Sequence, residues 1–101
     1  MKPMKSIKID KICTTPWSQA RGLMFSRKKT LLFVFQKERY VCIHNWFVLF
    51  PITLIFLNKQ KQVVEIKYLR PFSFTRAQNK AKYLIETPYP INITLNQKIE
   101  L

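Results

Sequence analysis

His44 is the only histidine of this 101-residue chain, and histidine is the side chain whose ordinary pKa suits acid–base chemistry near neutral pH. Cys42 stands two residues earlier, so the two side chains share a face if this segment is a strand. A thiolate nucleophile with a histidine base also needs a group that orients the base and a cleft for the substrate. The sequence identifies neither, so an enzyme with His44 as its acid or base is the third choice of function.

The spacing of metal-ligating residues argues against a metal site. Cys13, Cys42 and His44 would fill three of the about four positions around a zinc ion, but the chain has no Cys-x-x-Cys pair and no second histidine. We interpret His44 as a side chain at the edge of the core and both cysteines as buried thiols. We expect no metal and no cofactor.

Carboxylate pairs and phosphate-binding glycine loops are also disfavoured. The chain has five acidic residues and one glycine, Gly22, so no glycine-rich loop can surround a phosphate. The glutamates fall mostly on predicted turns or outward strand faces, which argues against a pair of catalytic carboxylates. They are Glu38, Glu65, Glu86 and Glu100.

The most unusual property of the composition is a formal net charge of +13, from 18 basic and five acidic residues. Such a charge suggests a nucleic acid or another anionic partner. Abundant Lys, Ile, Asn, Phe and Tyr with scarce Gly and Ala also fit an AT-rich coding sequence, which is a compositional cause. The basic residues are spread along the chain, and Arg27–Lys29 is the only run of three.

The segment Val41–Leu57 is the most apolar part of the chain, and it must be either core or membrane-embedded. Pro51 disfavours a spanning helix because it removes a hydrogen bond and clashes with the preceding turn. Pro51 instead divides the segment into two strand-length pieces. We expect no membrane span, a cytoplasmic location because Met1–Asp10 lacks a signal-peptide pattern, one domain over residues 1–101, and a monomer or weak oligomer.

The hydrophobic pattern predicts a succession of short strands. Ile7 and Ile9 alternate with Lys8 and Asp10, as in a half-buried strand, whereas residues 31–35 are apolar throughout, as in a strand covered on both faces. The predicted strands are 6–13, 31–35, 41–46, 52–57, 62–69 and 80–87, with one or two more in 91–101. Turns at 36–40 and 58–61 predict two hairpins, and 70–79 is predicted to be a loop. The fold class is therefore all-β, an antiparallel β-sandwich or a partly closed β-barrel.

One short helix is expected between the first two strands. Thr14 or Thr15 can cap it, Pro16 suits its first turn, and Gly22 is placed to end it in a left-handed conformation. Immediately after it, Leu23–Phe25 forms an apolar plug, comprising Leu23, Met24 and Phe25. We expect this plug to close one end of the sandwich or barrel.

Several blocks of residues, taken in order, are shared with a known family. They are Ala20–Phe25, Leu31–Phe35, Ile43–His44, Phe47, Phe50–Ile52, Ile55–Leu57, Val63–Lys67, Leu69–Phe72, Ala81–Tyr83 and Ile85–Glu86. Over nearly the whole chain, residues 6–101, this succession resembles the domain of unknown function 192 family. The resemblance implies a compact antiparallel β fold and no established biochemical role. Thr53 stands where the family often has an acidic residue.

Two functional hypotheses of different class follow. The first is a non-catalytic binding or structural module with an unknown partner. The second is a nucleic-acid-binding protein that uses a basic, aromatic-rich β surface with Trp46, Tyr68 and Tyr83 as stacking residues. Whether those aromatic rings point outward separates the two. The binding pocket hypothesis is that Arg21, His44 and Thr53 converge in the fold, supported by the structural motif Gly22–Phe25 and by Pro51.

Overall fold

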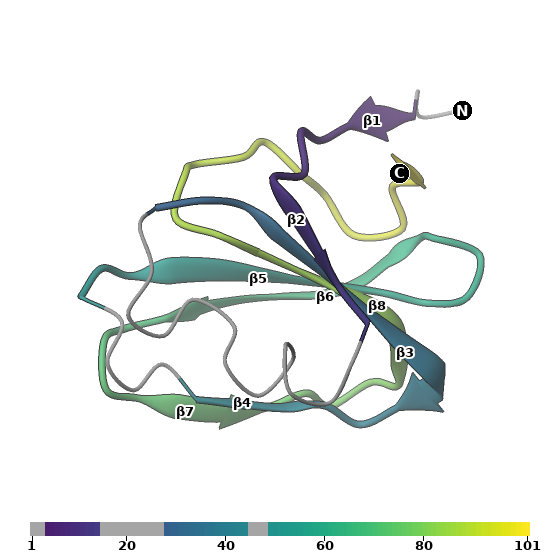
Figure 1. Cartoon of the computed structure of the whole chain (residues 1–101). Helices are drawn as coiled ribbons and strands as arrows, with labels where there is room; N and C mark the ends of the chain where they lie inside the picture. Colours follow the sequence, from purple (N-terminus) through teal and green to yellow (C-terminus); the bar gives the residue numbers. More distant parts are fainter. Residues whose placement is uncertain (1–3, 15–27, 45–48) are drawn as a thin grey trace.

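The computed structural model describes residues 4–14, 28–44 and 49–101, and it is built from strands in three sheets (Figure 1). The strands are β1 (Lys5–Ser6), β2 (Lys11–Cys13), β3 (Leu31–Arg39), β4 (Cys42–His44), β5 (Ile52–Leu57), β6 (Val63–Leu69), β7 (Phe74–Arg76), β8 (Ala81–Thr87) and β9 (Ile99–Glu100). The described residues contain no helix, so the all-β prediction is confirmed. The predicted short helix and the motif Gly22–Phe25 lie outside the described residues.

The central sheet has five strands in the order β2-β3-β8-β5-β6. β2 pairs with β3 in parallel, and the other neighbours are antiparallel. Two small sheets flank it, a parallel β1–β9 pair and an antiparallel β4–β7 pair. The prediction of a purely antiparallel fold is therefore wrong for two pairs. A parallel pair needs a long connection, and residues 14–30 supply one between β2 and β3. The described strands form no closed barrel, because β2 and β6 are separate edges.

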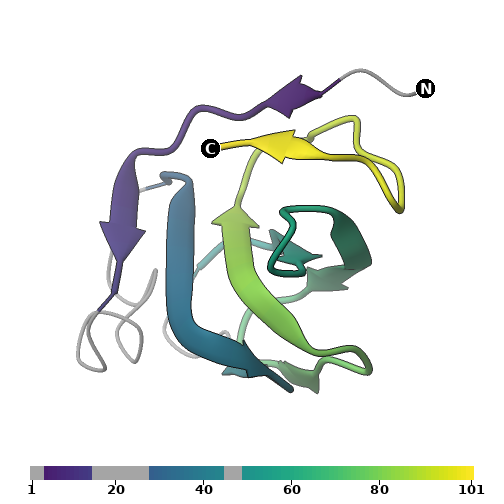
Figure 2. The same ribbon diagram turned by 90° about the vertical axis from the view of Figure 1, so that its right-hand side faces the viewer.

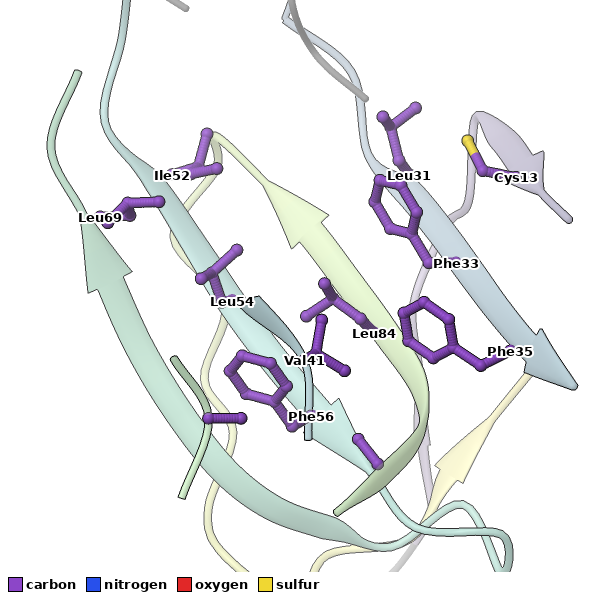
Figure 3. Close-up of a cluster of buried hydrophobic side chains, with 12 residues drawn as sticks. Cys13, Leu31, Phe33, Phe35, Val41, Ile52, Leu54, Phe56, Leu69 and Leu84 are labelled. Atoms are coloured by element: carbon purple, nitrogen blue, oxygen red, sulfur yellow. The ribbon is translucent and has the colours of Figure 1, made fainter. Parts of the chain in front are cut away.

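Apolar side chains cover both faces of the central sheet. One cluster joins its first face to the β4–β7 side and includes Phe33, Leu54, Phe56 and Leu84 (Figure 3). A second cluster on the opposite face packs Leu32, Ile55 and Ile85 against Ile99 of β9 and the partly buried isoleucines of residues 7–9 and 91–93. Alternate side chains of β3 and β5 enter opposite clusters, which explains why these strands are apolar at consecutive positions.

Several predicted elements are confirmed. β5 has the predicted bounds, and it forms the predicted hairpin with β6 across the turn at 58–61. In that turn the Asn58 side-chain oxygen accepts hydrogen bonds from the backbone N–H groups of Gln60 and Gln62, each at 3.0 Å. β8 and a short closing strand, β9, also occur as predicted.

No helix in the described part of the chain is long and apolar enough to cross a membrane.

The predicted hairpin between residues 31–35 and 41–46 is wrong. β3 continues through the polar residues 36–39 and pairs with β8 up to Arg39, across a bulge, and it bends as it does so (Figure 2). Polarity alone does not make a turn when no Gly, Pro, Asn or Asp is present. β4 instead pairs with β7, which lies inside the predicted loop 70–79.

The predicted strand over residues 6–13 is divided in two. β1 pairs with β9, whereas β2 pairs with β3. The chain changes partner between them, where the Asp10 N–H donates to the Thr30 carbonyl at 2.8 Å. The outward placement of Lys8 and Asp10 is nevertheless confirmed, because both are exposed while Ile7 and Ile9 are half-buried.

Glu65 on β6 is buried, so its predicted outward placement is wrong. Its carboxylate accepts hydrogen bonds from the backbone N–H groups of Gln78 and Asn79, each at 2.9 Å, and from the Asn79 amide at 3.0 Å. Lys67 forms an ion pair with it at 3.4 Å. This carboxylate therefore fixes the turn between β7 and β8 to the edge strand β6.

Removing this carboxylate should destabilise the fold. We expect Glu65→Ala to lower the free energy of unfolding by about 2 kcal/mol, because charge-assisted hydrogen bonds to backbone donors are lost. Glu100→Ala, at an exposed position of β9, is the matched control and should change little. Urea denaturation of both variants checks this, and coincident unfolding curves would contradict the assigned role of Glu65.

Candidate functional site

A shallow cleft lies at the end of the central sheet where β3 begins and β8 ends. Residues between β1 and β2, before β3 and after β8 come together there (Figure 2). Its volume is about 570 Å³. The lining residues are Lys8, Asp10, Lys28, Lys29, Thr30 and Tyr89. We call this feature the lysine cleft.

A second depression of about 280 Å³ adjoins the lysine cleft and shares Lys8, Thr30 and Tyr89 with it. Lys5 and Thr87 also line this depression. The two hollows form one basic surface, because four lysines surround them with a single carboxylate, that of Asp10.

Two buried threonines form the polar floor. The Thr30 and Thr87 hydroxyl oxygens lie 2.9 Å apart, within hydrogen-bonding distance. The Thr87 hydroxyl oxygen also accepts from the Tyr89 N–H at 3.2 Å. If Thr87 donates its proton to Thr30, the Thr30 hydroxyl proton remains available to a ligand in the cleft. The floor can therefore present a hydroxyl donor as well as positive charge.

Hydrogen bonds hold the walls of the lysine cleft to this floor. The Asp10 carboxylate accepts from the Thr30 N–H at 2.7 Å. The Tyr89 hydroxyl donates to the Lys28 carbonyl at 3.3 Å. Since Asp10 is bound to the backbone, its charge acts mainly to fix the start of β3.

The lysines around the cleft lack carboxylate partners in the described part of the chain, where the ion pair present is Lys67–Glu65. The Lys28 ammonium instead lies 5.8 Å from the centroid of the Phe50 ring. Four ammonium groups against the one carboxylate of Asp10 leave the local potential positive. This arrangement suits an anionic group.

Two of the three side chains of the pocket hypothesis lie outside the described part of the chain. Thr53 lies on β5, half-buried, directly opposite Thr87 of the cleft floor. His44 belongs to β4, opposite Phe74, and its side chain is outside the described part, as is Arg21. Pro51 is exposed immediately before β5. Convergence of Arg21, His44 and Thr53 stays a prediction, and Thr53 is the member that the fold places beside the lysine cleft.

The two cysteines differ in their exposure to solvent. Cys13 is buried, as predicted, but Cys42 is exposed, so the buried-thiol interpretation is wrong for Cys42. The reason is that β4 belongs to a two-stranded ribbon whose outer face is uncovered. Among the described residues, no group of three His, Cys, Asp or Glu side chains is placed to hold a metal ion.

Glu86 is a titratable group that the fold alters strongly. It lies on β8 between Leu31 of β3 and Leu54 of β5, and it is buried, so its predicted outward placement is also wrong. Burial raises the pKa of the Glu86 carboxyl to about 8, because the charged form loses its hydration. At neutral pH this carboxyl is therefore mainly protonated.

A family model supports the sequence resemblance. The model of DUF192, described as Uncharacterized ACR, matches residues 2–96. The chain belongs to the DUF192 family. The predicted resemblance is thereby confirmed, and the family description assigns no activity.

Relatives of the chain carry a shared family name. The UPF0127 protein of Thermococcus sibiricus is 37% identical over 93 residues, which cover 88% of this chain and 60% of that protein. A UPF0127 protein of Pyrococcus furiosus is 35% identical over 81 residues, covering 77% of this chain and 70% of the relative. The chain therefore spans well under the full length of these relatives.

Two solved structures share the fold. A protein from Sinorhizobium meliloti, named as a candidate transcription regulator, superposes with a TM-score of 0.71 at 20% identity, over 76% of this chain and 65% of that one. A protein of unknown function from Novosphingobium aromaticivorans superposes with a TM-score of 0.72 at 18% identity, over 79% of this chain and 63% of that one. At these identities the likeness shows the fold alone.

The buried Glu86 carboxyl predicts a distinctive dependence of stability on pH. Its pKa is higher in the folded chain than in the unfolded chain, so its contribution is fully present below about pH 4.5 and is lost as pH rises through about 8. We expect Glu86→Gln to be more stable than wild type at pH 8 and to lose this advantage towards pH 5. Urea denaturation of both proteins across this pH range measures the difference.

Other titrating groups affect both proteins alike and cancel in this comparison. Glu100→Gln, which changes an exposed carboxylate, controls for the change in net charge. Parallel pH profiles of wild type and Glu86→Gln would show that Glu86 is ionised in the folded chain.

Proposed function

We propose that this chain is a non-catalytic binding module that holds an anionic group of its ligand in the lysine cleft. The observation that carries the proposal is the gathering of four lysines around the buried Thr30–Thr87 hydroxyl pair. Ammonium and hydroxyl groups are the donors that bind phosphate, sulfate and carboxylate oxygens. The hydrogen bonds of Asp10 and Tyr89 hold the backbone at Thr30 and Lys28, so the segment that carries these donors need not be ordered by the ligand, which reduces the entropic cost of binding.

The proposal can be tested with tripolyphosphate, a compact probe of high negative charge. We expect Lys8→Gln/Lys28→Gln to weaken binding about tenfold, a loss of about 1.4 kcal/mol, since two ammonium groups of the cleft are removed. Isothermal titration calorimetry at near-physiological salt gives the dissociation constants.

The matched control is Lys37→Gln/Lys59→Gln, which removes two exposed lysines outside the cleft. It should bind tripolyphosphate nearly as wild type does. Equal weakening by the two double variants would assign the binding to net charge rather than to the cleft. Absence of wild-type binding at this salt concentration would overturn the proposal.

Nucleic-acid binding through the predicted aromatic surface is the second candidate. Tyr68 favours it because this ring points outward from the edge strand β6, with 80% of the residue exposed. Tyr83 does not, since it is half-buried against the second cluster, and Trp46 lies outside the described residues. One structural neighbour is named as a candidate transcription regulator, which makes DNA a suitable probe beside RNA. An enzyme with His44 as acid or base remains the third candidate.

A salt series distinguishes the first two candidates. A chain of this charge should bind polyanions at low ionic strength through counterion release alone. If the predicted aromatic surface does not bind nucleic acid, the affinity for oligonucleotides should be unchanged in Tyr68→Ala and Trp46→Ala at every salt concentration of the series. A base stacked on either ring would instead make each substitution cost about 1–3 kcal/mol. Fluorescence anisotropy with labelled oligonucleotides measures both effects.

A further inference from the structure

A second cationic surface lies at the other end of β3 and β8. There the exposed Tyr40 ring follows β3, Arg76 ends β7, and Lys80 precedes β8. The Arg76 guanidinium carbon lies 5.9 Å from the Tyr40 ring centroid, and the Lys80 ammonium nitrogen lies 5.8 Å from it. Arg39 adds a third positive charge one residue away and lies over the Phe35 ring at 5.6 Å. We call these four residues, Arg39, Tyr40, Arg76 and Lys80, the Tyr40 platform.

The backbone on both sides of Tyr40 is fixed by the fold. The Ala77 N–H donates to the Val41 carbonyl at 2.8 Å, and Arg76 is in register with Cys42. Glu65 holds Gln78 and Asn79 in the turn just before Lys80. Arg39 pairs with Ala81 of β8. The three cations are therefore carried by segments that cannot move apart freely.

Two cations near one ring repel each other unless an anion lies between them. Neither Arg76 nor Lys80 forms an ion pair with a carboxylate in residues 4–14, 28–44 and 49–101, where Glu65 is paired with Lys67. The Tyr40 residue keeps 46% of its surface exposed, which leaves it accessible to a ligand. A planar ring next to two uncompensated cations matches a nucleobase and its flanking phosphates, because bases stack on aromatic rings while phosphates bind Lys and Arg.

We propose that the Tyr40 platform binds single-stranded nucleic acid, with a base stacked on Tyr40 and the adjoining phosphates held by Arg76 and Lys80. This site is distinct from the lysine cleft, since the two lie at opposite ends of β3 (Figure 2). Nine residues of β3 separate them, which is about 30 Å along a strand. A compact anion in the cleft therefore cannot contact the platform.

The test uses a labelled single strand of about eight nucleotides, a length within the range for one small β domain. We expect Tyr40→Ala to weaken binding about tenfold at near-physiological salt, and Tyr40→Phe to bind as wild type does because the ring is kept. Arg76→Gln/Lys80→Gln should weaken binding and flatten its dependence on salt, since fewer counterions are released. Fluorescence anisotropy across a salt series gives the affinities.

Phe72→Ala is the matched control, because Phe72 is a more exposed aromatic residue between β6 and β7, outside both the Tyr40 platform and the predicted aromatic surface. Circular dichroism confirms that each variant is folded. Equal binding by wild type and Tyr40→Ala, or equal loss in Tyr40→Ala and Phe72→Ala, would overturn the proposal. Stronger competition by poly-glutamate than by unlabelled strand would also overturn it, by assigning the platform to an acidic peptide.

The test of the Tyr40 platform and the test of the lysine cleft can fail independently of each other. Tripolyphosphate titrations report on the cleft and should be unaffected by Tyr40→Ala. Conversely, Lys8→Gln/Lys28→Gln should leave the stacking contribution of Tyr40 intact. If wild type binds the single strand but not tripolyphosphate, only the proposal for the lysine cleft is rejected. If wild type binds tripolyphosphate but not the single strand, only the proposal for the Tyr40 platform is rejected.

Discussion

The need to cover both faces of the central sheet governs this fold. β3, β5 and β8 carry apolar side chains on both sides, and at about 25 cal/mol per Å² their burial supplies most of the stabilising free energy. A chain of 101 residues has few residues left to cover them. Two ribbons of two or three residues per strand, β1–β9 and β4–β7, lie over the opposite faces. Their few backbone hydrogen bonds, such as Lys5 N–H to the Lys98 carbonyl at 3.0 Å, fix these covers in place.

Covering both faces also determines the state of the carboxyl groups on the central strands. Glu65 lies on the edge strand β6, where backbone N–H groups and Lys67 can reach it. Glu86 lies on the interior strand β8, between strands on both sides, and burial raises its pKa to about 8. The backbone N–H groups of an interior strand are used in pairing with its two neighbours, so they cannot bind a buried carboxylate. A carboxyl group there is therefore more stable in its neutral form. The interior position of β8 in the sheet thus favours the neutral form of Glu86.

The sequence predicts where most strands lie, but it does not predict which strands pair or which glutamates are buried. β5 was predictable because its apolar residues are bounded by Pro51 and by the polar turn beginning at Asn58. The partner of β3 was not, because local alternation says nothing about which distant segment will pair with it. Glu65 and Glu86 alternate with apolar residues and so resemble outward positions. The burial of Glu65 instead involves a segment distant in sequence, the turn at Gln78 and Asn79, whose N–H groups bind its carboxylate.

The lysine cleft was unpredictable as a site for a related reason. Its lining residues come from three segments that are far apart in sequence, residues 8–10, residues 28–30 and Tyr89, and two of these segments supply the lysines. The alternation of residues 7–10 correctly placed Lys8 and Asp10 outward, yet it gave no sign that Thr30 and Thr87 would meet beside them. The pocket hypothesis included Thr53, which the register places opposite Thr87.

An AT-rich coding sequence, the compositional explanation of the lysines, would explain their number but not their surroundings. A compositional excess by itself requires only that each charge be solvated, and separated surface charges satisfy that requirement. At both ends of β3 and β8, however, cations lie beside polar or aromatic groups that can also contact a ligand: the Thr30 hydroxyl at one end and the Tyr40 ring at the other. Because apolar contacts occupy both faces of the sheet, these strand ends are where the fold can keep such groups together near solvent. Anion binding at the lysine cleft and at the Tyr40 platform would therefore depend on the placement of particular charges rather than on the net charge of +13.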